Sequence, residues 1–385
     1  MDGFDDSSKK HRDLQPKASP VRRSLKALLI VLALTSLYLG LWPVPVDPVA
    51  WEAPKAPGLV GAFAVNDRLR SADQLPLDGH EGPEDAALGP DGRLYLSTRS
   101  GHILRTDAHG EGASVFADTG GQPLGLDFAP DGRLIVADAY RGLLAIDAAG
   151  TVSVLATEAD GLPIRYADAV AVAPGGRIYF TDASTKFGAE AWGGSYPASL
   201  LDLLEHGGHG RLLEHDPVSG ATHTVASGLQ FANGVALTDD GAALVVETGN
   251  YRVVRVELTG PARGHLTPIL ENLPGFPDNL RRGLGGRFWL GLVSPRNGIV
   301  DALAGWPRLR SVVQRLPAFV RPKAESHGHL VQLTARGEVQ ASLQDPEGYG
   351  FVTGALETPE HLFITSLRMA TLARMSSKSL GFEGP

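Results

Sequence analysis

A twelve-residue pattern that recurs along the chain constrains the fold more than any other feature of the sequence. In Glu84–Tyr95 (EDAALGPDGRLY) a polar residue is followed by apolar residues two and four positions later, a glycine eight positions later and an aromatic residue eleven positions later. Recurrence of this kind indicates an architecture of similar units, each too small to bury a core alone. The six copies begin at Glu84, Leu124, Asp168, Asn233, Asp278 and Thr353, and the last is one residue shorter and lacks the glycine.

Each copy continues into alternating apolar and polar residues, as in GRLYLSTRSGHILRTD and GRLIVADAYRGLLAID. This alternation predicts two short strands joined by a turn. Copies without an insertion are spaced by about forty residues, which is the size of a four-stranded propeller blade. We therefore expect an all-β, six-bladed β-propeller with a central tunnel over residues 61–385. The segment before Glu84 is expected to complete the last blade, because such closure hides open strand edges.

Two insertions interrupt the spacing, at Lys186–Gly210 and Gly298–Ser326. The first predicts a short helix over Ala198–Leu204. The second combines apolar and basic residues, namely Trp306, Leu309, Val312, Val313, Leu316 and Phe319 with Arg308, Arg310 and Arg315. Three interpretations stay open for these insertions: packing on the blade edges, which we favour, roofing of the tunnel mouth, and, for the second, contact with lipid.

The N-terminus predicts a membrane anchor. Residues 1–26 hold seven basic and four acidic residues, and residues 27–46 are uncharged and almost wholly apolar. That length suits a transmembrane helix, and the preceding basic residues predict a cytoplasmic tail over 1–26. We expect an uncleaved signal anchor at 27–46, a linker at 47–60 and a propeller on the extracytoplasmic side, whether periplasmic, lumenal or extracellular. A cleaved signal peptide is the rival interpretation, disfavoured by the long polar leader and the lack of an A-x-A site.

Charge and composition exclude several classes of function. Residues 1–26 contribute +3 to a total of −8, so the remainder carries −11 and shows no basic stripe with interleaved aromatics. Nucleic acid is therefore not an expected partner. The chain has no cysteine, which excludes disulfides, thiolate metal ligands and a cysteine nucleophile.

The first residues of the six copies predict a metal site. The innermost strand of each blade lines the tunnel, so equivalent positions of different blades converge around its axis. Carboxylate and amide oxygens brought together there would repel one another unless a cation neutralised them, and such hard ligands suit calcium. The predicted ligands are Glu84, Asp168, Asn233 and Asp278, with Asn279 or Asp85 available beside them. The alternative is that these residues only cap turns.

Several segments carry a resemblance to a known family. They are GPEDAALGPDGRLYLS, PLGLDFAPDGRLIVADAYRGLLAID, GRIYFTDASTKF, GRLLEHDP, FANGVAL and LPGFPDNLR. In combination they resemble the strictosidine synthase-like branch of the calcium propellers, a superfamily that includes paraoxonases and gluconolactonases. The resemblance implies six blades, a calcium ion and hydrolysis of lactones or aryl esters. It places the ion ligands at Glu84, Asp168, Asn233 and Asp278, with Asn279 beside them.

Departures from the family pattern bear on the chemistry. The position of the paraoxonase catalytic histidine corresponds to Leu124, and that of the strictosidine synthase glutamate corresponds to Thr353. The base proposed for gluconolactonases corresponds to Asp278.

These considerations predict a calcium-dependent hydrolase whose substrate is a small lactone, an aryl ester or a carboxylic ester. Asp278 or Glu84 would activate the attacking water. A non-enzymatic, membrane-tethered propeller with a structural calcium ion is the alternative. A condensing enzyme of the strictosidine synthase type is a weaker one.

Overall fold

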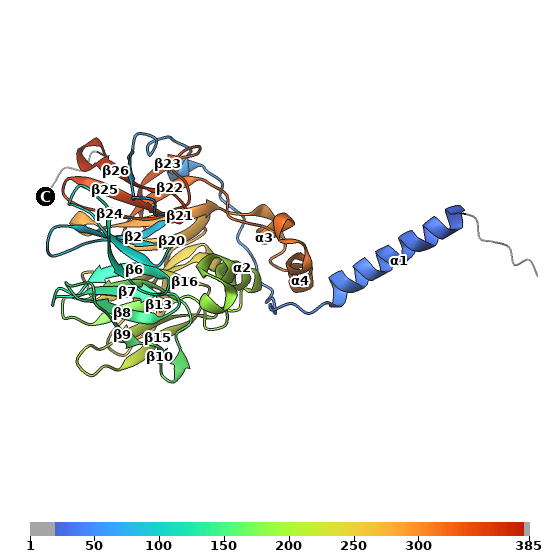
Figure 1. Cartoon of the computed structure of the whole chain (residues 1–385), viewed down its shortest axis with the longest axis horizontal. Coiled ribbons are helices and arrows are strands. Elements are labelled where there is room, and N and C mark those ends of the chain that lie inside the picture. Colours follow the sequence, from blue (N-terminus) through green and yellow to red (C-terminus); the bar gives the residue numbers. More distant parts are fainter. Residues whose placement is uncertain (1–19, 381–385) are drawn as a thin grey trace, which may run out of the picture.

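The computed structural model describes residues 20–380, and within that range the fold is the expected all-β six-bladed propeller preceded by one apolar helix (Figure 1). The predicted cytoplasmic tail over 1–26 lies mostly outside the described residues. The described part also includes a small β10–β11 hairpin (Glu158–Ala159 and Leu162–Pro163) beside the third blade.

Between residues 20 and 380 the blades are six antiparallel sheets of four strands each. The first two run from the inner strand outward as β2 (Pro83–Leu88), β3 (Leu94–Thr98), β4 (His102–Arg105) and β5 (Ser114–Asp118), then β6 (Pro123–Phe128), β7 (Leu134–Asp138), β8 (Gly142–Ile146) and β9 (Val152–Ala156). The next two are β12 (Ala167–Val172), β13 (Ile178–Asp182), β14 (Gly210–His215) and β15 (Thr222–Leu229), then β16 (Ala232–Leu237), β17 (Ala242–Glu247), β18 (Arg252–Glu257) and β19 (Leu266–Leu270). The fifth is β20 (Gly275–Arg282), β21 (Arg287–Pro295), β22 (Gly328–Thr334) and β23 (Val339–Asp345).

The last blade is closed by a strand from the start of the domain, as expected. β24 (Val352–Glu357), β25 (His361–Ser366) and β26 (Thr371–Ser376) are completed by β1 (Asp73–Pro76), which pairs antiparallel with β26. This pairing joins the two ends of the propeller domain and covers the outer edge of the last blade. The inner strands of the last and first blades, β24 and β2, are in contact.

Every inner strand carries a bulge at the same place. In β2, Pro83 pairs with Thr98 and Ala86 with Leu96, so Glu84 and Asp85 between them have no partner residue. The other five bulges fall at residues 124–125, 168–169, 233–234, 278–279 and 353–354. The first residue of each sequence copy is therefore the first residue of a bulge, where a strand can re-aim its side chain. The third copy has the same register as the others, with Asp168 in this position.

The hydrophobic core lies between neighbouring blades. One cluster joins Ile135 and Leu143 of the second blade to Val170, Ile178 and Phe180 of the third, and all five are almost fully buried. The alternation of apolar residues along each strand supplies these contacts on both faces of a blade. The core thus packs neighbouring blades against each other around the tunnel.

Both insertions lie on the side of the propeller that faces the N-terminal helix (Figure 1). The first forms η2 (Glu190–Trp192) and α2 (Ser195–Glu205), which contains and extends the predicted helix. The second forms α3 (Gly298–Ala302), α4 (Pro307–Arg315) and η5 (Ala318–Val320). The remaining short helical turns are η1 (Gly61–Phe63), η3 (Thr248–Asn250), η4 (Leu284–Gly286) and η6 (Ser377–Leu380).

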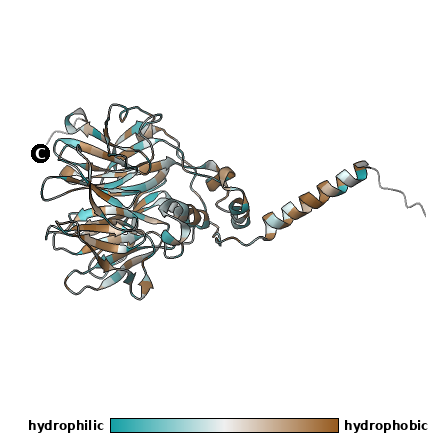
Figure 2. Cartoon of the chain, viewed as in Figure 1, coloured by the Kyte–Doolittle hydropathy of each residue, from teal (hydrophilic) through white to brown (hydrophobic). Residues whose placement is uncertain are grey.

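The N-terminal helix α1 spans Pro20–Leu41 and is apolar along most of its length (Figure 2). Its segment Ser24–Leu41 is long and apolar enough to cross a membrane. The helix ends five residues before the end of the predicted membrane segment 27–46, whose bounds stay a prediction. The helix stops at Leu41 because Pro43 lacks an amide hydrogen and disfavours helical geometry at the residue before it.

The segment after α1, which includes the predicted linker 47–60, packs along the molecule. The Val49 amide donates to the Glu205 carbonyl at 2.8 Å, and the Trp51 amide donates to the Ala304 carbonyl at 3.2 Å. The Trp51 indole stacks on the His206 ring, with centroids 4.0 Å apart. These contacts hold the segment against both insertions.

Candidate metal centre and pocket

Four of the five predicted ligands meet at the floor of a cavity of about 370 Å³. Glu84, Asp168, Asn233 and Asp278 all line it, and each side chain is at least 94% buried. Each comes from the bulge of a different inner strand, so the equivalence of the sequence copies becomes proximity in space.

Three of these residues are carboxylates, and burial makes their charged forms costly. Burial, followed by repulsion from Asp278 and Asp168, raises the pKa of Glu84 well above its usual value. Burial and then Asp278 and Asp182 likewise raise the pKa of Asp168. Burial raises the pKa of Asp278 to about 7, although a hydrogen bond from Asn233 works against the shift. A cation between the carboxylates would remove this cost.

Asn233 provides the clearest indication of a ligand. Its side-chain nitrogen donates to Asp278 Oδ1 at 2.7 Å, which fixes the orientation of the amide. Its Oδ1 is buried and has no hydrogen-bond partner among the described residues. A buried oxygen without a partner is costly unless something else pairs with it. The oxygen donors present therefore fit a hard cation such as calcium.

The structure places Asn279 and Asp85, the second residues of their bulges, toward the other end of the tunnel. Both line a separate cavity there. The Asn279 side-chain nitrogen donates to the Glu84 carbonyl at 3.0 Å. Asp85 accepts from Arg281 at 2.9 Å and from the Leu126 amide at 2.9 Å. A ligand role for Asn279 thus stays a prediction, and its observed contact supports the backbone of Glu84.

The two remaining positions of the ring carry no acid or base. Leu124 lines the cavity within an apolar cluster. The Thr353 hydroxyl donates to the Glu84 carbonyl at 2.7 Å and lies 2.9 Å from the Thr365 hydroxyl. Thr353 therefore holds the backbone of a predicted ligand and does not line the cavity.

A second ring of side chains, which the sequence analysis missed, stands above the carboxylates. The residue two positions before the start of a copy is aromatic in four of the six copies, and Tyr166, Phe231 and Phe276 line the cavity. The Tyr166 and Phe231 rings meet edge to face at 5.3 Å. Burial, and then Asp168 and Glu84, raise the pKa of Tyr166, so its phenol stays protonated. The same alignment of copies, shifted by two residues, would have revealed this ring.

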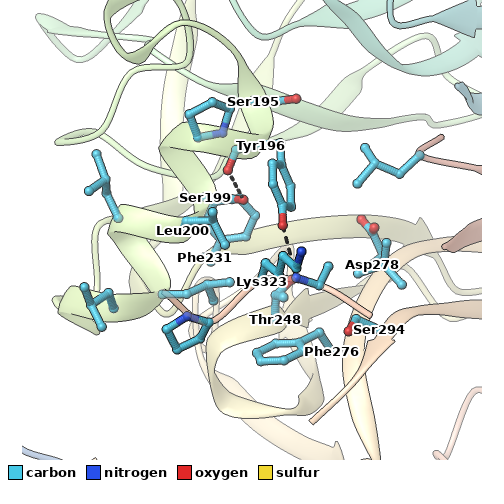
Figure 3. Close-up of a pocket in the computed structure, with 18 of the residues that line it drawn as sticks. Ser195, Tyr196, Ser199, Leu200, Phe231, Thr248, Phe276, Asp278, Ser294 and Lys323 are labelled. Atoms are coloured by element: carbon cyan, nitrogen blue, oxygen red, sulfur yellow. Dashed lines mark hydrogen bonds between the residues drawn. The ribbon is translucent and has the colours of Figure 1, made fainter. Parts of the chain in front are cut away.

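The insertions form the outer wall of the cavity. Tyr196, Ser199 and Leu200 of α2 lie across from Asp278 in Figure 3. The Tyr196 hydroxyl accepts a hydrogen bond from the Ala324 amide at 3.0 Å, which joins the two insertions over the tunnel mouth. The insertions therefore roof the mouth, and α2 also packs on the blades through Ala198 and Leu201, as the favoured prediction held.

The chain matches two family profiles. The family described as "Strictosidine synthase-like, N-terminal" matches residues 61–106, and "Strictosidine synthase" matches residues 168–261. Human adipocyte plasma membrane-associated protein is 31% identical over 381 residues, covering 92% of this chain and 90% of that protein. Protein STRICTOSIDINE SYNTHASE-LIKE 6 of Arabidopsis thaliana is 32% identical over 320 residues, covering 81% of this chain and 83% of that protein.

Solved structures share the fold. A gluconolactonase from Xanthomonas campestris has a TM-score of 0.59 at 19% identity, covering 86% of this chain and 98% of that chain. The calcium-binding protein regucalcin from Agrobacterium tumefaciens has a TM-score of 0.53 at 14% identity, covering 78% of this chain and 92% of that chain.

The architecture thus places the chain among six-bladed propellers of the shape shared by gluconolactonase and regucalcin. Within that class the chain belongs to the strictosidine synthase-like family, as the sequence segments led us to expect. It is similar along nearly its whole length to the adipocyte plasma membrane-associated proteins.

Proposed function

We propose that the protein is a calcium-dependent hydrolase of lactones or of aryl or carboxylic esters, held at a membrane by α1. The observation that carries this proposal is the Asn233 Oδ1, which has no hydrogen-bond partner within the described part of the chain and lies beside three buried carboxylates at the floor of a largely apolar pocket. The fold shared with a gluconolactonase and a calcium-binding propeller supports it.

Glu84, Asp168, Asn233 and Asp278 are the residues that would hold calcium, with Asn279 as a further candidate. When bound, calcium would act as a Lewis acid on the substrate carbonyl. Asp278, or Glu84 beside it, accepts the proton of the attacking water. Asp278 is the stronger candidate because Asn233 fixes its orientation through a 2.7 Å hydrogen bond. The apolar walls at Phe231 and Phe276 hold the hydrocarbon part of the substrate and limit access of bulk water.

The proposal includes the location of the protein. The apolar segment Ser24–Leu41 would cross the membrane once, with the N-terminus in the cytoplasm and the propeller on the periplasmic, lumenal or extracellular side. The similarity to adipocyte plasma membrane-associated proteins supports an attachment to membranes.

The test is hydrolysis of a panel of lactones and aryl esters by the full chain, with and without a calcium chelator. We expect the chelator to abolish turnover and added calcium to restore it. Asp278→Asn should lower kcat by about 10²- to 10⁴-fold, the usual contribution of a positioned base.

Asp202→Asn is the matched control. Asp202 is also buried and its pKa is also raised to about 7, but it bonds to Ser184 and does not line the cavity. This variant should keep wild-type turnover. Turnover that survives both the chelator and Asp278→Asn would rule out the proposed mechanism.

A second candidate function is a membrane-tethered propeller with a purely structural calcium ion. Leu124 and Thr353 favour it, because neither ring position can transfer a proton and the Thr353 hydroxyl is engaged with the backbone. Calcium would then raise the melting temperature while no substrate in the panel is turned over. The lack of a carboxylate at Thr353 also leaves a condensing activity without support.

A further inference from the structure

Exposed apolar side chains gather on the second insertion. Ile299, Trp306, Leu309, Phe319 and Val320, which we call the apolar rim, are between 46% and 83% exposed. Large exposed apolar side chains of the described blades, such as Val154 and Val218, occur singly on separate strands and turns. Exposed apolar side chains concentrated on one short segment mark a surface that contacts something apolar.

Hydrogen bonds tie this insertion to the end of α1. The Tyr38 hydroxyl donates to the Arg315 carbonyl at 3.1 Å. Arg315 in turn donates from Nε to the Trp42 carbonyl at 2.6 Å and from Nη1 to the Leu39 carbonyl at 3.0 Å. Tyr38 and Trp42 are the kind of residues that occupy a membrane–water interface. If α1 spans the bilayer, α4 therefore lies at the depth of the lipid headgroups.

The charge of the insertion suits an anionic surface. Residues 298–326 contain five basic and two acidic residues, whereas the whole chain carries −8. Of the basic residues, Arg310 is buried, and Arg308, Arg315, Arg321 and Lys323 are partly or largely exposed. A basic segment that also presents apolar side chains is typical of an interfacial helix.

The same segment forms the mouth of the pocket. Val313 and Gln314 of α4, with Ala318, Arg321 and Lys323 after it, line the cavity that contains the four oxygen ligands. Apolar rim, anchor contacts and pocket mouth are thus parts of one segment of 29 residues, 298–326.

We propose that the apolar rim inserts into the outer part of an anionic bilayer, so that the pocket opens at the membrane surface and takes substrates that partition into lipid. This inference rests on the proposed anchor and deepens the proposed function. It assigns the substrate class as amphiphilic lactones or esters with a long hydrocarbon chain, which reach the pocket along the membrane.

Depth in the bilayer can be measured without any catalysis. The chain has no cysteine, so a single introduced cysteine in the full chain carries a unique fluorescent label. We would compare Val320→Cys on the rim, Val218→Cys in the β14–β15 turn as a matched valine, and Leu34→Cys within α1. The protein is reconstituted in phosphatidylcholine–phosphatidylserine vesicles that contain nitroxide-labelled lipid.

We expect the labels at positions 320 and 34 to be quenched and the label at 218 to remain unquenched. Quenching at 34 without quenching at 320 would overturn the inference and leave the anchor in place. Absence of quenching at both positions would overturn the inference and the proposal that α1 spans the membrane. Hydrolysis of water-soluble substrates would still test the proposed metal centre separately.

Kinetics test the route of the substrate. Phe319→Asp places a charge on the rim at a side chain that is 83% exposed and does not line the cavity. We expect it to raise KM for a long-chain lactone carried in vesicles by about tenfold or more. It should leave kcat/KM for a short-chain, water-soluble lactone unchanged. Equal effects on both substrates, or an effect matched by Val218→Asp, would overturn the inference.

Discussion

At the scale of single residues, Asn233 favours the proposed metal centre over a cluster of acids that binds no ion. Its amide nitrogen is engaged by Asp278 and its oxygen is buried without a partner among the described residues. Saturation with calcium at a hundredfold excess over Kd should add about 2.7 kcal/mol to the free energy of unfolding.

Asn233→Leu should lose most of this gain, because it removes one proposed ligand and the hydrogen bond that orients another, Asp278. Thermal unfolding with calcium and with chelator measures the difference. Asn250→Leu is the control, since Asn250 bonds to Glu247 away from the cavity and should keep the full calcium effect. A calcium-induced rise in Tm that is unchanged by Asn233→Leu would contradict this assignment.

The three carboxylates also predict a dependence on pH. Their folded-state pKa values are raised, that of Asp278 to about 7. Without calcium, the folded state retains protons that the unfolded state releases above its ordinary pKa of about 4, so the free energy of unfolding falls as the pH rises from about 4 to 7. Calcium bound at the proposed site would replace these protons. The rise in Tm on adding calcium should thus be larger at pH 8 than at pH 5, and an equal rise at both values would contradict the model of the site.

At the scale of secondary structure, the bulges allow the inner strands to meet closely around the tunnel. The second bulge residue is glycine in three copies, at Gly125, Gly234 and Gly354. A Cβ added at Gly234 would lie 2.2 Å from the Leu280 amide nitrogen and 2.7 Å from the Asp278 carbonyl. Backbone atoms this close cannot move aside without shifting the strand that carries Asp278.

Gly234→Ala should therefore lower the free energy of unfolding by about 3 kcal/mol and weaken calcium binding. Gly175→Ala is the control, because nothing lies within 4 Å of a Cβ at that turn position and its effect should stay within about 0.5 kcal/mol. Chemical denaturation and calcium titration measure both variants. Equal free energies of unfolding for Gly234→Ala and Gly175→Ala would show that the close approach of Gly234 to the strand carrying Asp278 is not required for stability.

How far the sequence predicts these elements depends on what sets them. Period-two alternation and turn glycines fix the strands locally, so the blades and the alignment of Glu84, Asp168, Asn233 and Asp278 were predictable. The side of the strand on which the Asn279 side chain lies depends on the local geometry of the bulge in β20. The spacing of the copies along the sequence does not reveal that geometry. The roof depends on long-range contacts such as the bond from Ala324 to Tyr196, which have no local signature. The aromatic residues that line the cavity, Tyr166, Phe231 and Phe276, could have been found by comparing the six copies two positions before their first residues.

At the scale of the whole molecule, stability depends on the closing strand β1. Leu75 pairs with Leu372 across β1 and β26, is 8% exposed, and packs in a cluster that joins the last blade to the first. Leu75→Ala should lower the free energy of unfolding by about 2–4 kcal/mol, because it opens a cavity at the point where the ring closes.

Val154→Ala on the outer strand β9 is the control, since Val154 is 47% exposed and its loss should cost about 0.5 kcal/mol or less. Denaturant unfolding followed by tryptophan fluorescence measures both. A small effect of Leu75→Ala would mean that the closing strand contributes little to holding the propeller together.

Arg310 has a consequence for how the domain can be dissected. It is 1% exposed and donates to the carbonyls of Leu204 at 2.8 Å and Ala304 at 3.2 Å, and also to that of Val49. Arg310 therefore joins both insertions to the segment that follows α1. A fragment that starts at residue 61 would leave this guanidinium short of an acceptor and uncover the ring of His206. A form of the protein that lacks α1 but keeps the pocket roof intact should therefore begin near residue 43 and carry residues 47–60 as part of the folded domain.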